Sequence, residues 1–351
     1  MEKNILSICK FLARKTIYQS KYAIKRWLSR NYVSRQIVRV DFKPIPVNLK
    51  EIRLFMTARN ESLRLPFILD YYLSQGVNRI FVVDNNSSDD TESIVLSKKE
   101  THLFFTNDKY IRQGYWIDFL LRRYGVGHWC LIVDADEVFV YPNYEKVTIH
   151  QLCQYLDREA YNVVDAVLLD MYPSVPLDAV EYKLGTDPIS IAPWFDIDSY
   201  TTDMRGPLFL DDHNIIYEGP ERVFGGMRKR VFGVHACISK FPLVKFNRSM
   251  FLSAGTHFIH NARVADIRAG LLHFKYLNDF SENVKIEVKR EAHWRNAAEY
   301  KEYSKTFNCC PSLNLHSSSS RKFTGSDQLI TLDIMKTSQK FDEFGCQLID
   351  L

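Results

Sequence analysis

Residues 129–137 read Trp129-Cys130-Leu131-Ile132-Val133-Asp134-Ala135-Asp136-Glu137, a short apolar run that ends in three carboxylates. An apolar run bounded by charge is typical of a buried strand in a parallel sheet. Ligands of such sheets bind at the carboxyl ends of the strands, where these acids fall. If the backbone stays extended, Asp134 and Asp136 point to the same side, because side chains alternate along a strand. Two like charges that close favour a cation between them.

Carboxylate oxygens of this kind suit Mg²⁺ or Mn²⁺, and such an ion keeps open positions that substrate phosphates can fill. A nucleotide diphosphate is therefore the natural ligand. The alternative is that a strand-end Asp-x-Asp is only a solvated turn or a helix cap, and the motif alone does not decide between the two.

The segment before this motif alternates apolar runs with helical patterns. We expect strands at 53–58, 79–83 and 102–106, and helices at 66–72 and 115–124 that end near Gly76 and Gly125. This order predicts an α/β fold with a parallel sheet, right-handed crossovers and polar clusters gathered along one edge.

Several short segments, in this order and spacing, resemble a known family. They are Ala58-Arg59-Asn60-Glu61, residues 83–91, Asp134-Ala135-Asp136-Glu137, Leu169-Asp170-Met171-Tyr172, residues 225–230 and Leu272-His273-Phe274-Lys275-Tyr276. On these segments, residues 51–280 resemble a bacterial glycosyltransferase of the family 2 type, in the subgroup with an Arg-Asn-Glu entry motif and an Asp-x-Asp motif. The resemblance implies the GT-A fold, which is a Rossmann-like, mostly parallel sheet flanked by helices, here with helical N- and C-terminal extensions.

The resemblance also implies roles for individual residues. Asp84 would hold the uracil or ribose end of a nucleotide-sugar donor, and His273 would close the metal site from a later loop. The entry motif lacks the second acid common in processive relatives, which favours transfer of single sugars over polymer synthesis. The expected metal ligands are Asp134, Asp136 and His273, and the expected donor-binding residues are Arg59, Asn60, Glu61, Asp84, Asn86, Asp134, Arg228, Arg230 and Lys275.

The chemistry of the residues agrees with these roles. Imidazole and carboxylate together suit Mn²⁺ or Mg²⁺ bound to a diphosphate, and Lys275, on the same face as His273 if the chain is extended, would neutralise the leaving group. The alternative is that His273, beside Leu271 and Leu272, is a hydrogen-bonded core residue.

The stretch 218–230 has the composition of a flexible anion-binding loop, because glycines let backbone N–H groups approach a phosphate and guanidinium groups fork onto it. A basic hairpin facing solvent is the alternative. An inverting transfer also needs a base for the acceptor hydroxyl. Asp203, Glu221 and His257 are the candidates in the acceptor half, and the sequence does not rank them.

Charge divides the chain. Residues 1–50 hold 12 of the 46 Lys and Arg residues but only 2 of the 42 Asp and Glu residues. We therefore predict three parts, which are a basic amphipathic helical arm at 1–50, a GT-A domain at 51–280 and a helical extension at 281–351. Within the GT-A domain, residues 51–145 form the nucleotide-sugar-binding half and residues 146–280 the acceptor half. The extension includes a charged helix at 282–303.

The arm suits an anionic membrane surface, reached through residues 1–40, or a helix packed on the catalytic domain, and nucleic acid is not expected as a partner. No run reaches the roughly 18 apolar residues that a membrane span needs. We expect a cytoplasmic protein, at the inner face of the cell membrane if the arm binds lipid.

The function predicted from the sequence is metal-dependent, inverting transfer of a sugar, in the manner of a hexosyltransferase, from a nucleotide-diphosphate sugar to a cell-envelope glycan or lipid-linked acceptor. A UDP-sugar is the expected donor. One alternative is a nucleotidyltransferase. Such enzymes normally have a glycine-rich loop after the first strand, whereas residues 57–63 of this chain contain no glycine. The other alternative is an inactive GT-A scaffold that acts as a binding protein.

Overall fold

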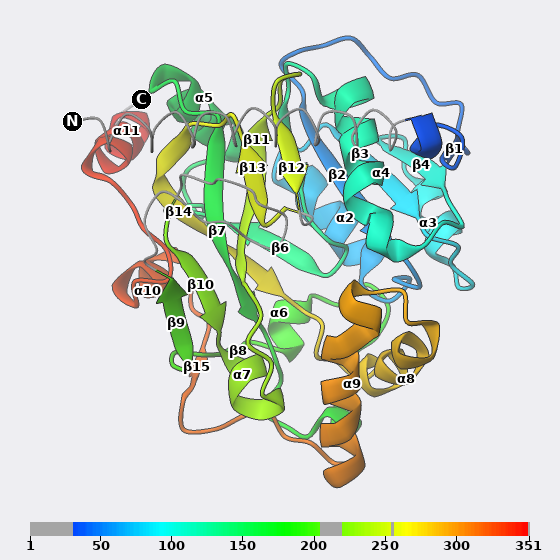
Figure 1. The fold of residues 1–351 in the computed structure, drawn as a ribbon. Helices are drawn as coiled ribbons and strands as arrows, with labels where there is room; N and C mark the ends of the chain where they lie inside the picture. The colour runs from blue at the N-terminus through cyan, green and yellow to red at the C-terminus, as the bar shows by residue number, and fades with distance from the viewer. Residues whose placement is uncertain (1–30, 204–219, 254–255, 350–351) are drawn as a thin grey trace, which may run out of the picture.

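The structure is a computed structural model that describes residues 31–203, 220–253 and 256–349. Within these residues, nine strands form one central sheet in the order β1-β4-β3-β2-β5-β11-β7-β14-β6 (Figure 1). In that order the strands span Val38–Arg39, Thr101–Phe105, Arg79–Asp84, Ile52–Ala58, Trp129–Ile132, Ser239–Lys245, Val163–Asp170, Val264–His273 and Glu137–Val140.

One half of the sheet is parallel. β4, β3, β2 and β5 run in the same direction, and they lie at the four segments that the sequence predicts as strands. The α/β fold class, with a large sheet flanked by helices, is confirmed. In the other half β7 and β14 are also parallel to each other, whereas β11 runs antiparallel to both β5 and β7, and β6 runs antiparallel to β14.

The sheet is buried on both faces, which explains why strands such as β2, β3 and β5 are mostly apolar rather than alternating. All seven residues of β2 are buried. Leu54 and Met56 pack with α2 (Leu65–Ser74) on one face, and Phe55 packs with Trp116 of α4 (Gln113–Leu120) on the other. Because side chains alternate along β2, this strand contributes to two separate hydrophobic cores, one on each face of the sheet.

Helices complete the first half of the chain. The predicted helices at 66–72 and 115–124 are confirmed as α2 and as α4 with the helical turn that follows it. The other helical elements here are α3 (Thr91–Ser97), η1 (Tyr110–Arg112), η2 (Leu121–Gly125) and α5 (Ile149–Arg158).

Short elements connect the strands of the second half and extend from them. Figure 1 shows α7, α8 and α9 grouped at the end of the sheet where β7 and β14 finish. The elements are η3 (Leu177–Ala179), α6 (Pro188–Ile191), β8 (Trp194–Asp196), β9 (Tyr200–Asp203), β10 (Arg222–Gly225), α7 (Met227–Phe232), β12 (Phe251–Ser253), β13 (Phe258–His260), α8 (Phe280–Arg290), α9 (Trp294–Cys309), β15 (Ser320–Lys322), α10 (Ser326–Thr331) and α11 (Gln339–Ile349).

The prediction of one charged helix at 282–303 is wrong. Two helices, α8 and α9, cover this stretch, because Glu291 adopts a left-handed conformation (φ 48°) that ends α8. The C-terminal segment packs on the main sheet domain, where Phe341 and Phe344 of α11 meet the ring of Tyr155 on α5.

Most of the N-terminal arm, residues 1–30, lies outside the described residues. The prediction of a helix up to residue 50 is wrong for residues 38–50, which contain β1 and an irregular segment. Pro44 and Pro46 explain this, since proline has no N–H for a helix. Among the described residues, no helix is both long and apolar enough to cross a bilayer.

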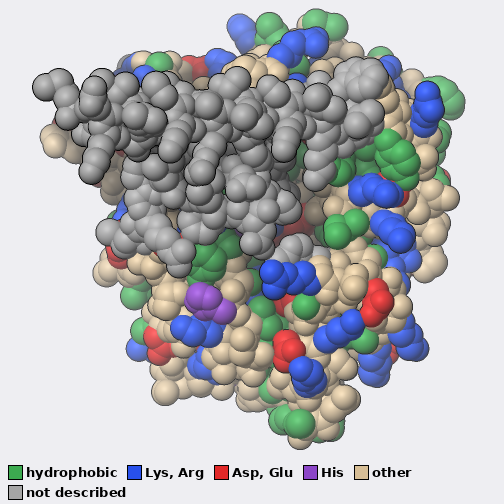
Figure 2. All heavy atoms as spheres, viewed as in Figure 1, with side chains coloured by type: hydrophobic (Ala, Val, Ile, Leu, Met, Phe, Trp, Pro, Cys, Tyr) green, Lys and Arg blue, Asp and Glu red, His purple; other side chains and the backbone are tan. Residues whose placement is uncertain are grey.

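The visible face carries mixed charge. Figure 2 shows Lys and Arg side chains interspersed with Asp and Glu over its described part.

Two glycines allow a test of the packing around α7. Gly225 and Gly233 both have positive φ, +96° and +68°, but a Cβ on Gly225 would collide with the carbonyl oxygen of Ser199, whereas one on Gly233 meets no atom within 4 Å. We expect Gly233→Ala to cost about 1–2 kcal/mol for the left-handed conformation. Gly225→Ala should cost about 3 kcal/mol or more, because the collision adds to the same strain. Urea denaturation measures both, and equal losses would contradict this account.

Candidate functional site

Three strand ends meet at the centre of the candidate site. His273 is the last residue of β14, which lies between β7 and β6, and its register partners are Asp170 on β7 and Glu137 on β6. The backbone N–H of Phe274 donates to the carbonyl oxygen of Asp136 (2.8 Å). This pairing brings Asp136, Asp170 and His273 together from segments that are up to 137 residues apart in the sequence.

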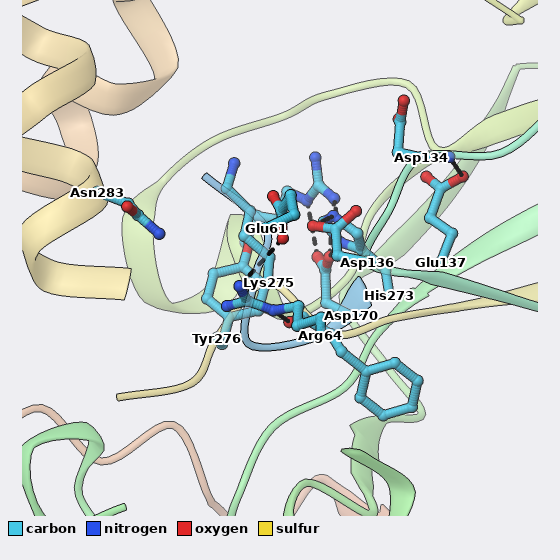
Figure 3. Close-up of polar contacts among 12 residues, drawn as sticks. Glu61, Arg64, Asp134, Asp136, Glu137, Asp170, His273, Lys275, Tyr276 and Asn283 are labelled. Atoms are coloured by element: carbon cyan, nitrogen blue, oxygen red, sulfur yellow. Dashed lines mark hydrogen bonds and ion pairs between the residues drawn. The ribbon is translucent and has the colours of Figure 1, made fainter. Parts of the chain in front are cut away.

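These residues form a continuous polar chain (Figure 3). His273 Nε2 lies 3.2 Å from Asp136 Oδ2, and His273 Nδ1 lies 2.7 Å from Asp170 Oδ1. Arg228 of α7 completes the chain with two hydrogen bonds of 2.7 Å to the carboxylate of Asp170. All four side chains are largely buried, so each charge depends on its neighbours rather than on water.

Electrostatics follow from this burial. Burial by itself would lower the pKa of His273, but the carboxylates of Asp136 and Asp170 raise it to about 9. Burial would raise the pKa of Asp136, and the neighbouring His273 instead holds it well below the ordinary value. In the structure as it stands, an imidazolium therefore bridges two carboxylates.

The Asp136–His273 pair fits a divalent cation. The 3.2 Å between Oδ2 and Nε2 is close to the separation of adjacent ligands in an octahedral site, about 3 Å for bonds of roughly 2.1 Å. A carboxylate on the other ring nitrogen, here Asp170, is the usual support of a metal-binding histidine. Among the described residues, no three His, Cys, Asp or Glu side chains already form a metal-binding group.

Asp134 points away from this pair, although the sequence predicts it as a third ligand. The backbone turns after β5, and the N–H of Glu137 donates to the carbonyl oxygen of Asp134 (3.1 Å). The Asp134 carboxylate accepts a hydrogen bond from Gln113 (2.8 Å) and pairs with Lys240 (2.9 Å). Figure 3 shows Asp134 beside Glu137 and apart from Asp136 and His273. The condition for the predicted geometry, an extended backbone, is not met.

The Arg-Asn-Glu entry loop is tied to the loop after β3. Asn60 accepts a hydrogen bond from the backbone of Ser88 (2.8 Å), and Arg59 donates to the carbonyl oxygen of Asn85. Asp84 is buried and accepts hydrogen bonds from Ser87, whereas Asn86 is exposed with a left-handed backbone. The structure thus brings these predicted donor-binding residues to the carboxyl ends of β2 and β3.

Glu61 connects this loop to the His273 strand. Its carboxylate lies 3.2 Å from Arg64, and Arg64 also pairs with Asp279 and donates to the carbonyl oxygen of Phe274 (3.0 Å). Burial raises the pKa of Glu61 to about 8, although Arg64 acts in the opposite direction. Arg64 therefore anchors the chain just beyond His273.

Lys275 is enclosed by rings. Its Nζ lies 4.4 Å from the ring centre of Tyr300 and 4.9 Å from that of Tyr303, and 4.0 Å from the Glu299 carboxylate. Burial lowers the pKa of Lys275, with the charge of Glu299 opposing the shift. The charge of Asp136 also opposes this lowering of the pKa of Lys275.

The prediction of a flexible anion-binding loop at 218–230 fails for its described part. Gly225 and Gly226 donate their backbone N–H groups to the carbonyls of Ala236 and Ser199. Arg228 pairs with Asp170, and Arg230 pairs with Asp196 (2.6 Å), which is fully buried. Both guanidinium groups are occupied by carboxylates of the protein, because α7 directs them into the fold.

The candidate bases lie in different surroundings. Asp203 on β9 is 3.8 Å from Arg222, and Glu221 precedes β10. His257 Nδ1 lies 2.8 Å from the carbonyl oxygen of Ser239, which is the residue before Lys240. Burial, followed by the charge of Lys240, lowers the pKa of His257 to about 4, so its ring is neutral at pH 7.

Sequence reasoning missed four residues of this region. Arg64, Gln113 and Lys240 belong to no recognised motif, and nothing in their local pattern marks them. Asp170 could have been found, because it ends an apolar strand in the same way as Asp134 and lies in one of the segments that resemble the family.

Comparisons with known proteins found no matching family model and no matching curated protein. Two solved structures of glucosyl-3-phosphoglycerate synthase from Mycobacterium tuberculosis, both with Mn²⁺ and UDP, match at 17% and 15% identity, each with a TM-score of 0.24. The matches cover 34% and 36% of this chain. They cover 44% and 50% of the two solved chains, so this chain spans half or less of their length.

A structure of 4-diphosphocytidyl-2C-methyl-D-erythritol synthase matches at 12% identity and a TM-score of 0.25, over 40% of this chain and 70% of that one. At these TM-scores, the strand order rather than the matches defines the fold, and the reaction has to be argued from the site.

Asp170 and Asp165 form a matched pair for testing the polar chain. Both are buried on β7, and both pair with an arginine: Asp165 with Arg268 (2.8 Å) and Asp170 with Arg228 (2.7 Å). Only Asp170 also contacts His273. We expect each Asp→Asn substitution to cost about 3 kcal/mol of stability, since each removes the closest counter-charge of a buried guanidinium. Only Asp170→Asn should also weaken Mn²⁺ binding, by about 10- to 100-fold.

Chemical denaturation and Mn²⁺ titration of the folded variants separate the two effects. Equal Mn²⁺ affinity in the two variants would show that Asp170 does not support His273 as a ligand.

Proposed function

We propose that the protein is a metal-dependent, inverting glycosyltransferase that moves a sugar from a nucleotide-diphosphate donor to a hydroxyl acceptor. The observation that supports this proposal best is the 3.2 Å separation of Asp136 Oδ2 and His273 Nε2 at the strand ends, with Asp170 behind the imidazole. A histidine and a carboxylate leave most positions of an octahedral ion to phosphate oxygens and water.

In this proposal the bound Mn²⁺ or Mg²⁺ would neutralise the diphosphate as it departs. Asp136 and His273 would hold the ion, and His273 would give up its Nε2 proton to do so while Asp170 fixes the ring through Nδ1. Lys275, at the border of the same site, would add positive charge to the leaving diphosphate.

The donor's nucleoside would lie at the ends of β2 and β3. Arg59, Asn60 and Asn86 line this edge, and Asp84 holds the loop through Ser87. We propose a UDP-sugar as donor, with the family 2 subgroup and hexosyl transfer as parts of the same proposal. Arg228 and Arg230 support the site through Asp170 and Asp196 instead of binding phosphate.

The acceptor in this proposal is a cell-envelope glycan or a lipid-linked sugar. The basic arm at 1–40 would bring the enzyme to an anionic membrane surface on the cytoplasmic side.

His257 is the base that we favour. A carbonyl oxygen only accepts hydrogen bonds, so His257 Nδ1 carries the proton that is shared with Ser239 and leaves a lone pair on Nε2. The neutral ring at pH 7 is the form that a base requires. Asp203, by contrast, faces a guanidinium group.

Asp136→Asn should strongly weaken metal-dependent donor binding while the fold survives, because His273 keeps its second partner, Asp170, when the Asp136 charge is removed. We expect UDP affinity in the presence of Mn²⁺ to fall about 100-fold or more, roughly 2.7 kcal/mol. Isothermal titration with UDP and Mn²⁺ measures the loss, and the wild-type protein in EDTA should fall to the level of the variant. Unchanged affinity in a folded variant would remove Asp136 from the metal site.

His257→Gln should lower kcat about 100-fold, which is the usual contribution of a general base, with the donor KM within threefold of wild type. Glu221→Gln and Asp203→Asn are the comparison variants and should keep most of the turnover. Steady-state kinetics with a glycan acceptor distinguish the three, and a large kcat loss in either comparison variant alone would reassign the base.

A further inference from the structure

Lys240 is a buried cation for which the proposed reaction has no step. Its Nζ lies 2.9 Å from Asp134 Oδ2 and also contacts Glu137 Oε1, and only 10% of its side chain is exposed. The other oxygen of Glu137 accepts the backbone N–H of Asp134 (3.0 Å), and Asp134 Oδ1 accepts Gln113 Nε2 (2.8 Å). One ammonium group thus serves two carboxylates.

The backbone of β11 becomes irregular directly after Lys240. The pairing of β11 with β7 shifts register between Lys240 and Leu243, and Pro242, which has no N–H for the ladder, lies within the shift. Irregularities of this kind redirect a side chain and are common beside active sites. Lys240 is thus the last regularly paired residue before this irregularity, and its side chain reaches the turn at 134–137.

The same turn separates the two acids of the Asp-x-Asp motif. Asp134 and Glu137 face the ammonium, whereas Asp136 faces His273. A pair of carboxylates that share one cation is the arrangement that would otherwise attract a divalent ion. Lys240 occupies that position with a single charge that the protein itself supplies.

We propose that Lys240 is a positioning residue, a resident cation that takes the place of a second divalent ion and keeps Asp134 out of the metal site at Asp136 and His273. This inference rests on the proposed function for the identity of that site. It makes the site mononuclear, with Asp136 as its one carboxylate ligand.

The test uses Mn²⁺ alone and the full chain, and it counts bound ions by electron paramagnetic resonance. Lys240→Met should bind one Mn²⁺ more than wild type, because Asp134 and Glu137 lose their ammonium partner. Lys240→Arg retains the charge and should keep the wild-type count. Lys240→Met combined with Asp134→Asn should lose the added ion. A merely structural role would lower the melting temperature of Lys240→Met and leave the count unchanged, and that result in folded protein would overturn the proposal.

A second measurement decides the matter even if Lys240→Met does not fold. Asp134→Asn should keep the Mn²⁺-dependent affinity for UDP within threefold of wild type, since Lys240 and Gln113 are its partners and the metal is not. A loss of tenfold or more would make Asp134 a ligand and overturn the proposal. Failure of the proposed function looks different: wild type and Asp136→Asn would then bind Mn²⁺ and UDP equally, while the ion gained in Lys240→Met would still be seen.

Discussion

The buried carboxylate of Asp170 is the interaction on which the rest of the site depends. It pairs with Arg228 through two hydrogen bonds and with the imidazole of His273 through a third. Removing three such charged groups from water is costly, so the cluster persists only because each member has a partner in good geometry. It fixes α7 against the ends of β7 and β14, and it orients His273 toward Asp136.

The position of β14 between β7 and β6 makes this cluster possible. β14 pairs with β7 on one side and β6 on the other, so one strand end places His273 beside acids that come from two different parts of the chain. Arg64, far earlier in the sequence, secures the next turn by binding the carbonyl oxygen of Phe274 and the carboxylate of Asp279. The entry loop and the His273 strand are therefore held as one unit.

In the proposed function, charge is distributed so that one place is left for a metal ion. Arg228, Arg230 and Lys240 each have a carboxylate of the protein as partner, and Lys275 lies among aromatic rings. In that proposal the imidazole of His273 is the cationic partner that would lose its proton, and Asp136 would then be available to a divalent ion. Asp134 pairs with Lys240, whereas Asp136 pairs with His273. The two acids of the motif therefore lie in different chemical environments.

The sequence by itself determined the parallel half of the sheet, because β2, β3, β4 and β5 are continuous apolar runs whose length and spacing are local properties. It also pointed to Asp136, which follows an apolar run, whereas His273 was indicated only by the family resemblance. Only the tertiary structure decided their partners. The two acids of the turn at 134–137 have their partners on distant segments, Lys240 and Gln113 for Asp134 and His273 for Asp136. Local sequence patterns do not encode such contacts. Nothing in the sequence near Lys240 therefore indicates that it pairs with Asp134, 106 residues away.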